Sequence, residues 1–306
     1  MIFHSIRRIG KGTLCTSVVL LVILAGVAAR SAEQLNTPPQ GHFAQLNGIK
    51  MYYEVYGEGK PLVLLHGFGG SSANWAQFIP AFSKNYKVIA IDMRGHGRST
   101  NPSNTFTHRQ SALDIFALMD QLRIQKFKAI GVSSGGMTLL HMATQQPARV
   151  EAMILVDATS YFPEPARAIM RADTAETMTT QEWEEARKIH KYGDEQIRAL
   201  RGDFHNFKDS YDDMNFTPPY LTTITAYTLV VHGDHDQFFP VGIPAQVFCS
   251  IPHSFLWIIP NGGHVPILRR EKEFTEIALE FLSGEWWKEK DSSAKPWPKY
   301  DCMIPE

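Results

Sequence analysis

The hexapeptide Gly-Val-Ser-Ser-Gly-Gly at residues 131–136 constrains the fold of this chain more than any other stretch. A short apolar run, residues 126–130, precedes it, and residues 137–146 after it have a helical pattern. A strand, a sharp turn with the pattern G-x-S-x-G and a helix together form a nucleophile elbow, in which one serine is exposed and strained. The flanking glycines lack a Cβ, so the strand and the helix can approach closely. They frame Ser133, which is therefore the candidate nucleophile; taking Ser134 instead would break the frame.

A second glycine-rich stretch, His-Gly-Phe-Gly-Gly at residues 66–70, follows the continuous apolar run of residues 61–65. Such a run is typical of a strand buried on both faces. A glycine-rich loop after a central strand can turn a backbone N–H toward the serine, and we assign that role to Phe68. The N–H of Ser134, at the amino end of the next helix, would be the second donor of this oxyanion hole. The Phe68 side chain is expected to line the substrate pocket, and His66 to stabilise the turn.

Apolar strands and helical stretches alternate along the chain up to about Tyr161 and resume in its last third, which predicts a parallel sheet with right-handed crossovers. One of the expected helices spans residues 72–85. Two short strands around Asn47-Gly48 predict a β-hairpin near the start. Residues 161–222 show no strand pattern but contain prolines, aromatics and a charged helical stretch. We therefore expect an α/β fold with a mostly parallel central sheet flanked by helices, and an inserted helical cap.

A serine hydroxyl is a weak nucleophile at neutral pH, so it needs a base within hydrogen-bond reach and an acid that orients the base. Polar loops after later strands supply candidates in the order Ser, Asp, His. They are His-Gly-Asp-His-Asp at residues 232–236 and Asn-Gly-Gly-His-Val-Pro at residues 261–266. The first loop could be misread as a metal site. Four potential ligands in five residues of one loop rarely converge on one ion, so we expect no metal.

Taken together, these stretches resemble the α/β-hydrolase superfamily, over about residues 43–283. Besides the elbow and the loops quoted above, the resemblance rests on Asp-Met-Arg-Gly-His-Gly-Arg-Ser at residues 92–99. This stretch is expected to be a structural turn with an internal Asp/Arg polar network. The resemblance implies a serine hydrolase with a Ser-Asp-His triad, an oxyanion hole and no cofactor. These motifs are specific for the fold and the triad, and weak for the substrate.

The same resemblance assigns the triad. The acid is Asp236, the fourth residue of a Gly-x-x-Asp loop, while Asp157, at the end of the preceding strand, is the position that some relatives use instead. The base is His264, behind a glycine pair that lets its loop reach the elbow; His253 and His235 are the alternatives. The residues expected to line the substrate pocket are Phe68, Met137 and Val265.

The predicted activity is hydrolysis of a small ester-like substrate, a carboxylic ester or a lactone, by two-step acyl transfer through Ser133. A serine at the elbow excludes relatives that need an aspartate nucleophile. Relatives that cleave carbon–carbon bonds typically carry a tryptophan after the catalytic histidine, where this chain has Val265. Carbon–carbon bond hydrolysis, perhydrolysis and amide cleavage are the alternatives, together with a non-catalytic protein that holds a ligand. A formal net charge of -1 predicts no nucleic-acid partner.

The amino terminus has the pattern of a signal peptide. Basic residues at positions 7, 8 and 11 precede an apolar run over residues 13–27, which is short for a membrane span. Small residues place the cut after Ala29; a cut after Ser31 and an uncleaved anchor are the alternatives. We therefore expect a periplasmic or secreted protein, without stable membrane association after cleavage.

The predicted organisation combines these observations. It comprises a signal peptide at residues 1–29, a linker at 30–42, the α/β-hydrolase core at 43–160 and 223–283, the helical cap at 161–222 and a tryptophan-rich carboxyl-terminal tail at 284–306. After cleavage Cys249 and Cys302 would remain, and an exported chain could pair them in a disulfide or keep both as thiols.

Overall fold

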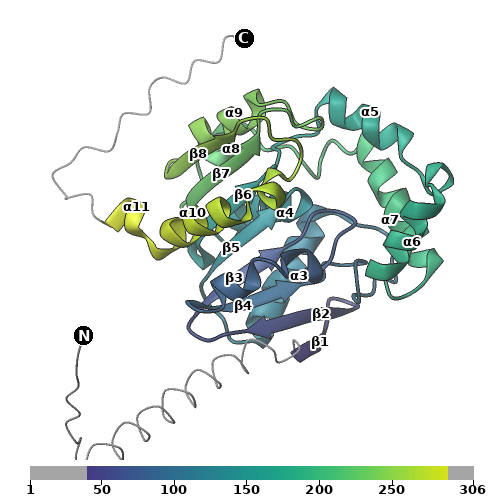
Figure 1. Cartoon of the computed structure of the whole chain (residues 1–306), viewed down its shortest axis with the longest axis horizontal. Helices are drawn as coiled ribbons and strands as arrows, with labels where there is room; N and C mark the ends of the chain where they lie inside the picture. Colours follow the sequence, from purple (N-terminus) through teal and green to yellow (C-terminus); the bar gives the residue numbers. More distant parts are fainter. Residues whose placement is uncertain (1–39, 289–306) are drawn as a thin grey trace, which may run out of the picture. The chain divides into compact units, whose positions relative to one another are not determined.

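The computed structural model describes residues 40–288, and a sheet of eight strands runs through them (Figure 1). The strand order is β1-β2-β4-β3-β5-β6-β7-β8. β2 pairs antiparallel with both β1 and β4, and all other neighbours are parallel, so the predicted mostly parallel sheet is confirmed. The strands are β1 (Gln40–Leu46), β2 (Ile49–Tyr56), β3 (Lys60–Leu65), β4 (Tyr86–Ile91), β5 (Phe127–Val132), β6 (Val150–Val156), β7 (Tyr227–Gly233) and β8 (Ser254–Ile259).

The local patterns account for these strands. β1 and β2 form the predicted hairpin, where Asn47 (φ 43°) and Gly48 (φ 76°) both have positive φ, as a tight turn between twisted strands requires. β5 overlaps the predicted apolar run at residues 126–130, and nearly every side chain in β5 and β6 is buried. Strands of this kind lie in the middle of a parallel sheet that is covered on both faces.

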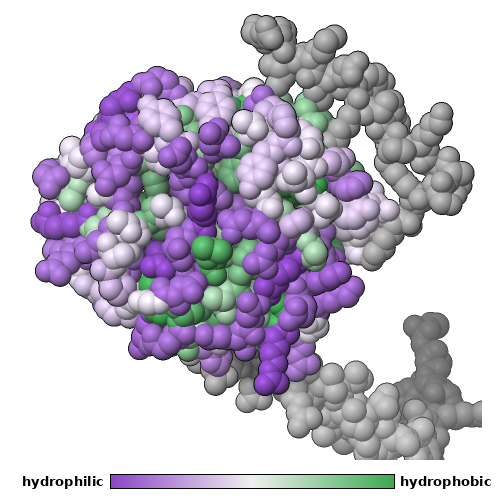
Figure 2. Space-filling model, turned by 180° about the vertical axis from the view of Figure 1, so that it is seen from behind, coloured by the Kyte–Doolittle hydropathy of each residue, from purple (hydrophilic) through white to green (hydrophobic). Residues whose placement is uncertain are grey.

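Helices cover both faces of the sheet, and each face has its own apolar core. One core includes side chains of α3 (His108–Gln121), α4 (Ser134–Gln145) and α9 (Gly242–Ser250). The other includes side chains of a short 3-10 helix, η1 (Ser72–Trp75), of α2 (Ile79–Phe82) and of α10 (Glu271–Ser283). Seen from behind, most of the described surface is hydrophilic, with apolar residues gathered near the middle of that face (Figure 2).

The expected helix over residues 72–85 is wrong: η1 and α2 are two separate short helices in this stretch. The reason is Pro80, which lies in the first turn of α2. Proline has no backbone N–H and its ring clashes with the preceding turn, so it begins a helix readily but does not continue one.

The segment between β6 and β7 is helical, as the sequence predicts; in Figure 1 its helices α5, α6 and α7 lie together on the right, while α8 lies beside α9. Among the residues of this cap, only an isolated bridge between Tyr161 and Asn215 is strand-like. The backbone N–H of Lys191 donates to the Gly97 carbonyl at 3.0 Å, which ties the cap to the turn after β4. The helices are α5 (Glu164–Ala172), α6 (Thr180–Ile189), α7 (Asp194–Asn206) and α8 (Pro218–Leu221), with short 3-10 turns at Ala175–Thr177 and Phe207–Asp209.

Residues 92–99 form the predicted structural turn, but its two arginine side chains, Arg94 and Arg98, form their ion pairs with carboxylates outside the turn and not with Asp92. Asp92 accepts hydrogen bonds from the backbone N–H groups of Ser72 (2.6 Å) and Arg98 (2.8 Å). Arg94 instead pairs with Asp114 of α3 at 2.7 Å. The polar network therefore extends beyond the turn and holds it against η1 and α3.

Both ends of the described part differ slightly from the predicted boundaries. β1 begins at Gln40, inside the predicted linker, and a short helix, α11 (Glu285–Lys288), follows α10 inside the predicted tail. Trp287 stacks on Tyr227 of β7 with ring centres 4.3 Å apart, so the start of the tail packs on the sheet. The predicted signal peptide and residues 289–306 lie outside the described residues.

The bonding of Cys249 and the length of the helices bear on two of the predictions. Cys249 of α9 is disulfide-bonded. Cys15 and Cys302 both lie outside the described residues, so the pairing of Cys249 with Cys302 stays a prediction. Within residues 40–288, none of the helices combines the length and the apolar character that crossing a membrane demands.

Candidate active site

The elbow has the geometry that its sequence predicts. Ser133 lies between β5 and α4 with φ 50° and ψ -116°, a strained conformation for a residue with a side chain. A Cβ added to Gly131 would lie 2.5 Å from the backbone of Gly135. One added to Gly135 would lie 2.4 Å from the Leu65 carbonyl oxygen. Only glycine fits at these two positions, and the close approach they permit presents Ser133 at the carboxyl edge of the sheet.

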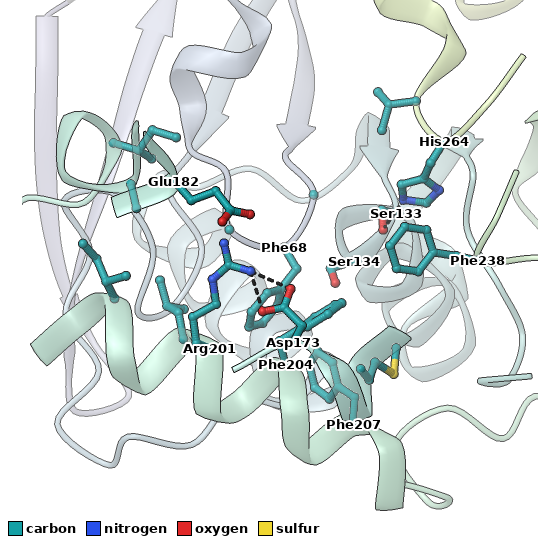
Figure 3. Close-up of a pocket in the computed structure, with 18 of the residues that line it drawn as sticks. Phe68, Ser133, Ser134, Asp173, Glu182, Arg201, Phe204, Phe207, Phe238 and His264 are labelled. Carbon is teal, nitrogen blue, oxygen red and sulfur yellow. Dashed lines mark hydrogen bonds and ion pairs between the residues drawn. The ribbon is translucent and has the colours of Figure 1, made fainter. Parts of the chain in front are cut away.

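The structure brings the three predicted triad residues together (Figure 3 shows Ser133 and His264). The Nε2 atom of His264 lies 3.1 Å from the Ser133 Oγ, and its Nδ1 lies 2.8 Å from the Asp236 Oδ2. The other oxygen of Asp236 accepts the N–H of Phe238 at 2.7 Å. Burial would raise the pKa of Asp236, but the hydrogen bond and charge of His264 outweigh it and lower that pKa below its ordinary value. An ionised Asp236 therefore holds the proton of His264 on Nδ1 and leaves Nε2 free to accept from serine.

Asp157, the alternative acid, has different partners. Its two carboxylate oxygens accept the backbone N–H groups of Gly233 (3.0 Å) and Val265 (2.7 Å). Burial raises the pKa of Asp157 to about 6, against the opposing effects of the neighbouring histidines. Val265 has φ 62°, which is unfavourable for a β-branched residue, and its bond to Asp157 helps to hold it there. Asp157 thus positions the loops that carry the acid and the base.

The other candidates for the base lie elsewhere. His235 is exposed and pairs with Asp234 at 2.7 Å, and Asp234 also accepts the N–H of Gly262, which gives it a loop-shaping role. His253 packs on the Tyr227 ring, with ring centres 5.2 Å apart. The polar side chains of residues 232–236 point in different directions, since His232 is fully buried while His235 faces solvent.

The predicted oxyanion donors lie beside the elbow. A Cβ on Gly67 would lie 3.5 Å from the Ser133 Cβ, so the glycine-rich loop runs directly past the serine. Within the described part of the chain, the N–H groups of Phe68 and Ser134 donate to no acceptor. His66 stabilises this loop as expected: its Nδ1 lies 2.7 Å from the Gly67 carbonyl, and its Nε2 accepts the N–H of Met93. Two unpaired N–H groups next to a nucleophile can bind a developing oxyanion.

A cavity of about 370 Å³ opens above the elbow, between the core and the cap. The predicted lining residues Phe68, Met137 and Val265 all contribute to it. Near Ser133 its walls are apolar, and Figure 3 shows Phe68, Phe204, Phe207 and Phe238 around this part.

The far end of the same cavity is charged, a feature that the sequence pattern did not predict. Asp173, Glu182, Glu185 and Arg201 line it, and the Arg201 guanidinium pairs with Asp173 at 2.6 Å (Figure 3). Asp173 directly follows α5, Glu182 and Glu185 belong to α6, and Arg201 belongs to α7. A charged stretch at 180–191 was visible in the sequence, but nothing in its pattern indicated which charges face the pocket.

Comparison with known proteins agrees with this geometry. Residues 60–181 match a family model described as "alpha/beta hydrolase fold". The dihydrolipoyllysine-residue acetyltransferase component of the acetoin cleaving system of Pseudomonas putida is 38% identical over 280 residues, which cover 84% of this chain and 72% of that protein. The human serine hydrolase BPHL is 26% identical, with 89% of this chain and 98% of the relative covered.

Among solved structures, a meta-cleavage product hydrolase from Pseudomonas fluorescens IP01 superposes with a TM-score of 0.65 and 25% identity. The match covers 80% of this chain and 98% of that one. The strand order and the elbow geometry agree with these similarities to known proteins. The chain therefore belongs to the alpha/beta hydrolase fold family, as a serine hydrolase.

Proposed function

We propose that this protein hydrolyses carboxylic esters or lactones by two-step acyl transfer through Ser133. The observation that carries the proposal is the hydrogen-bonded line from Ser133 through His264 to Asp236, beneath an apolar cavity. A serine so placed is activated for attack on a carbonyl, and the line of hydrogen bonds fixes which nitrogen of His264 accepts its proton.

The steps follow from these positions. His264 takes the proton of Ser133 as the Oγ attacks the carbonyl carbon, and the N–H groups of Phe68 and Ser134 bind the oxyanion. His264, stabilised by Asp236, then gives the proton to the leaving alcohol, and an acyl-enzyme remains. In the second step His264 takes a proton from water, the resulting hydroxide attacks the acyl carbon, and Ser133 recovers its proton as the acid leaves.

The cavity supports an uncharged acyl group. The walls next to Ser133 are aromatic or aliphatic, and the charged residues of the cap lie at the far end. Apolar walls with a few placed polar groups are typical of small-molecule sites. An acyl chain of short or medium length can therefore occupy the apolar part without placing carbon atoms against Asp173 or Glu182.

Carbon–carbon bond hydrolysis is the second candidate, and one observation favours it: the similarity to a meta-cleavage product hydrolase over most of both chains. A dienoate substrate carries a carboxylate, and among the described residues that line the cavity Arg201 is the one lysine or arginine that could pair with it. That guanidinium already pairs with Asp173, and Glu182 and Glu185 also line this end. Net negative charge there disfavours an anionic substrate, so the ester proposal ranks first.

A substrate panel separates the two candidates. We expect turnover of p-nitrophenyl esters of short and medium chain length, measured beside lactones, amides and a meta-cleavage dienoate. Phe204→Ala should lower kcat/KM for medium chains more than for short ones, because Phe204 lines the apolar wall. Tyr211→Ala, an exposed aromatic residue of the cap outside the cavity, is the matched control. Turnover of the dienoate alone, with every ester and lactone inert, would reverse the ranking.

We further propose that the protein is exported and that its mature form begins near Arg30. The basic residues, the apolar run and the small residues before position 30 support this proposal. Mass spectrometry of the protein recovered from its native host should find an amino terminus at or next to Arg30 in the periplasm or medium. Recovery of a chain with an intact Met1 from the cytosol would contradict export.

A further inference from the structure

Ser134 takes part in a second line of hydrogen bonds, separate from that of Ser133. Its Oγ lies 3.1 Å from the Nε2 of His108, and the Nδ1 of His108 lies 2.6 Å from the Asp213 Oδ2. His108 is 0% exposed, Ser134 3% and Asp213 9%. The three residues belong to α4, α3 and the cap, so a Ser-His-Asp line is buried next to the candidate nucleophile. We call it the Ser134 relay.

The surroundings of Asp213 decide where the protons lie. Its carboxylate also accepts the backbone N–H groups of His108 (2.9 Å) and Arg109 (3.1 Å), at the amino end of α3. Burial alone would raise the pKa of Asp213, but the hydrogen bonds and charge of His108 hold it well below its ordinary value. An ionised carboxylate only accepts, so the ring of His108 must carry its hydrogen on Nδ1.

The tautomer of His108 in turn fixes the hydroxyl of Ser134. With its hydrogen on Nδ1, the neutral ring has only a lone pair on Nε2, so the Ser134 O–H must donate to it. The aromatic rings of Phe106, Phe162 and Phe207 surround His108, with ring centres 5.2 to 6.0 Å away. What Ser134 has left for a ligand is the lone pairs of its oxygen.

Ser134 lines the cavity of the active site. In Figure 3 it lies beside Ser133, on the side of Phe68 and Phe207 and away from His264. The leaving group must be close to His264, which protonates it, so the acyl group extends toward Ser134. The oxygen of Ser134 is therefore a polar atom in an otherwise aromatic part of the wall, next to the carbonyl that reacts.

We propose that the Ser134 relay makes the Ser134 Oγ a fixed hydrogen-bond acceptor that selects acyl groups with a hydroxyl or N–H donor on the carbon next to the reacting carbonyl. Ser134 contacts the substrate and determines specificity, while His108 and Asp213 are positioning residues that act through it. The inference rests on the proposed function, because it takes Ser133 as the nucleophile. A matching donor should favour the substrate by about tenfold, the effect of one neutral hydrogen bond.

The test compares three esters of the same size class that differ on the carbon next to the carbonyl. Ethyl mandelate carries a hydroxyl there, which can donate; ethyl phenylacetate carries only hydrogen; ethyl α-methoxyphenylacetate carries a methoxy group, which can only accept. The ratios of kcat/KM in a variant are divided by those of the wild type, which cancels the intrinsic reactivity of each ester. Ser134→Ala should lower the mandelate-to-phenylacetate ratio by about tenfold. Asp213→Asn should lower the same ratio by less than Ser134→Ala, because an amide can present either its oxygen or its NH₂ to the His108 Nδ1 and so no longer holds the ring hydrogen on that nitrogen.

Two controls separate specificity from folding. Asp212→Asn changes an exposed neighbour of Asp213 in the same way and should leave all ratios as in the wild type. Nitrogen-15 NMR of the His108 ring should find the hydrogen on Nδ1 in the wild type and partly on Nε2 in Asp213→Asn. If Asp213→Asn does not fold, His108→Gln replaces it. Ratios that Ser134→Ala leaves unchanged, in a protein with wild-type circular dichroism, would overturn the inference.

Failure of the proposed function looks different. In that case wild-type protein turns over none of the three esters, and the relay is tested by binding alone. Calorimetric titration of Ser133→Ala with mandelamide and phenylacetamide should favour mandelamide by about tenfold, and the added Ser134→Ala substitution should remove the preference. Equal binding of the two amides by Ser133→Ala would contradict the relay whatever the reaction is.

Discussion

Replacing Ser133 with alanine is expected to reduce the turnover of a good ester substrate by about 10⁶-fold and to abolish covalent labelling by a fluorophosphonate. The substitution removes the oxygen that lies 3.1 Å from the Nε2 of His264, so no acyl-enzyme can form at this position. The oxyanion hole and the cavity would remain and give a small residual rate. Steady-state kinetics and intact-mass measurement of the labelled protein test both effects.

The neighbouring serine supplies the matched control. Ser134→Ala removes an equivalent hydroxyl but keeps the backbone N–H that is proposed to bind the oxyanion, so this variant should still be labelled at Ser133. Fragmentation of the labelled peptide distinguishes the two serines, which are adjacent in sequence. A label on Ser134 of the wild type, or labelling that survives in Ser133→Ala, would contradict the assignment of Ser133 as the nucleophile.

The elbow could be predicted because its requirements are local. Gly131 and Gly135 lie within four residues of each other, and each faces backbone that a Cβ would overlap. The hairpin at Asn47-Gly48 is equally local, since positive φ at both positions follows from the turn itself. The acid and the base came from the resemblance to a known fold, and the structure brings both to the same serine.

Other features depend on contacts between distant residues. His108 and Asp213 are 105 residues apart, and neither lies in a sequence motif that predicts their contact. Asp157 was visible as an alternative acid, but its bonds to the backbone of β7 and of the His264 loop follow only from the packed structure. Which charged side chains face the far end of the cavity depends on how α6 and α7 are rotated about their own axes when they pack. Pro80 was a local signal that should have divided the helix predicted over residues 72–85.

Asp236→Asn is expected to lower kcat by about 10⁴-fold while the protein stays folded. The Asp236 Oδ2 lies 2.8 Å from the His264 Nδ1, and an amide nitrogen there would favour the tautomer with the proton on Nε2. That proton would face the Ser133 Oγ and prevent His264 from acting as a base. The remaining oxygen can still accept the N–H of Phe238, so the loop keeps its conformation. Kinetics and urea unfolding of the same preparation separate the two effects.

Asp157→Asn makes the same chemical change at the end of the neighbouring strand, and it should give the opposite pattern. Both oxygens of Asp157 accept backbone N–H groups, from Gly233 and Val265, so an amide must turn its NH₂ toward one of them. A buried donor left without an acceptor costs about 1–3 kcal/mol of the free energy of unfolding. Because Val265 follows His264, kcat should also fall, but by far less than in Asp236→Asn. A larger loss of kcat in Asp157→Asn, with unfolding unchanged, would make Asp157 the acid of the triad and Asp236 its support.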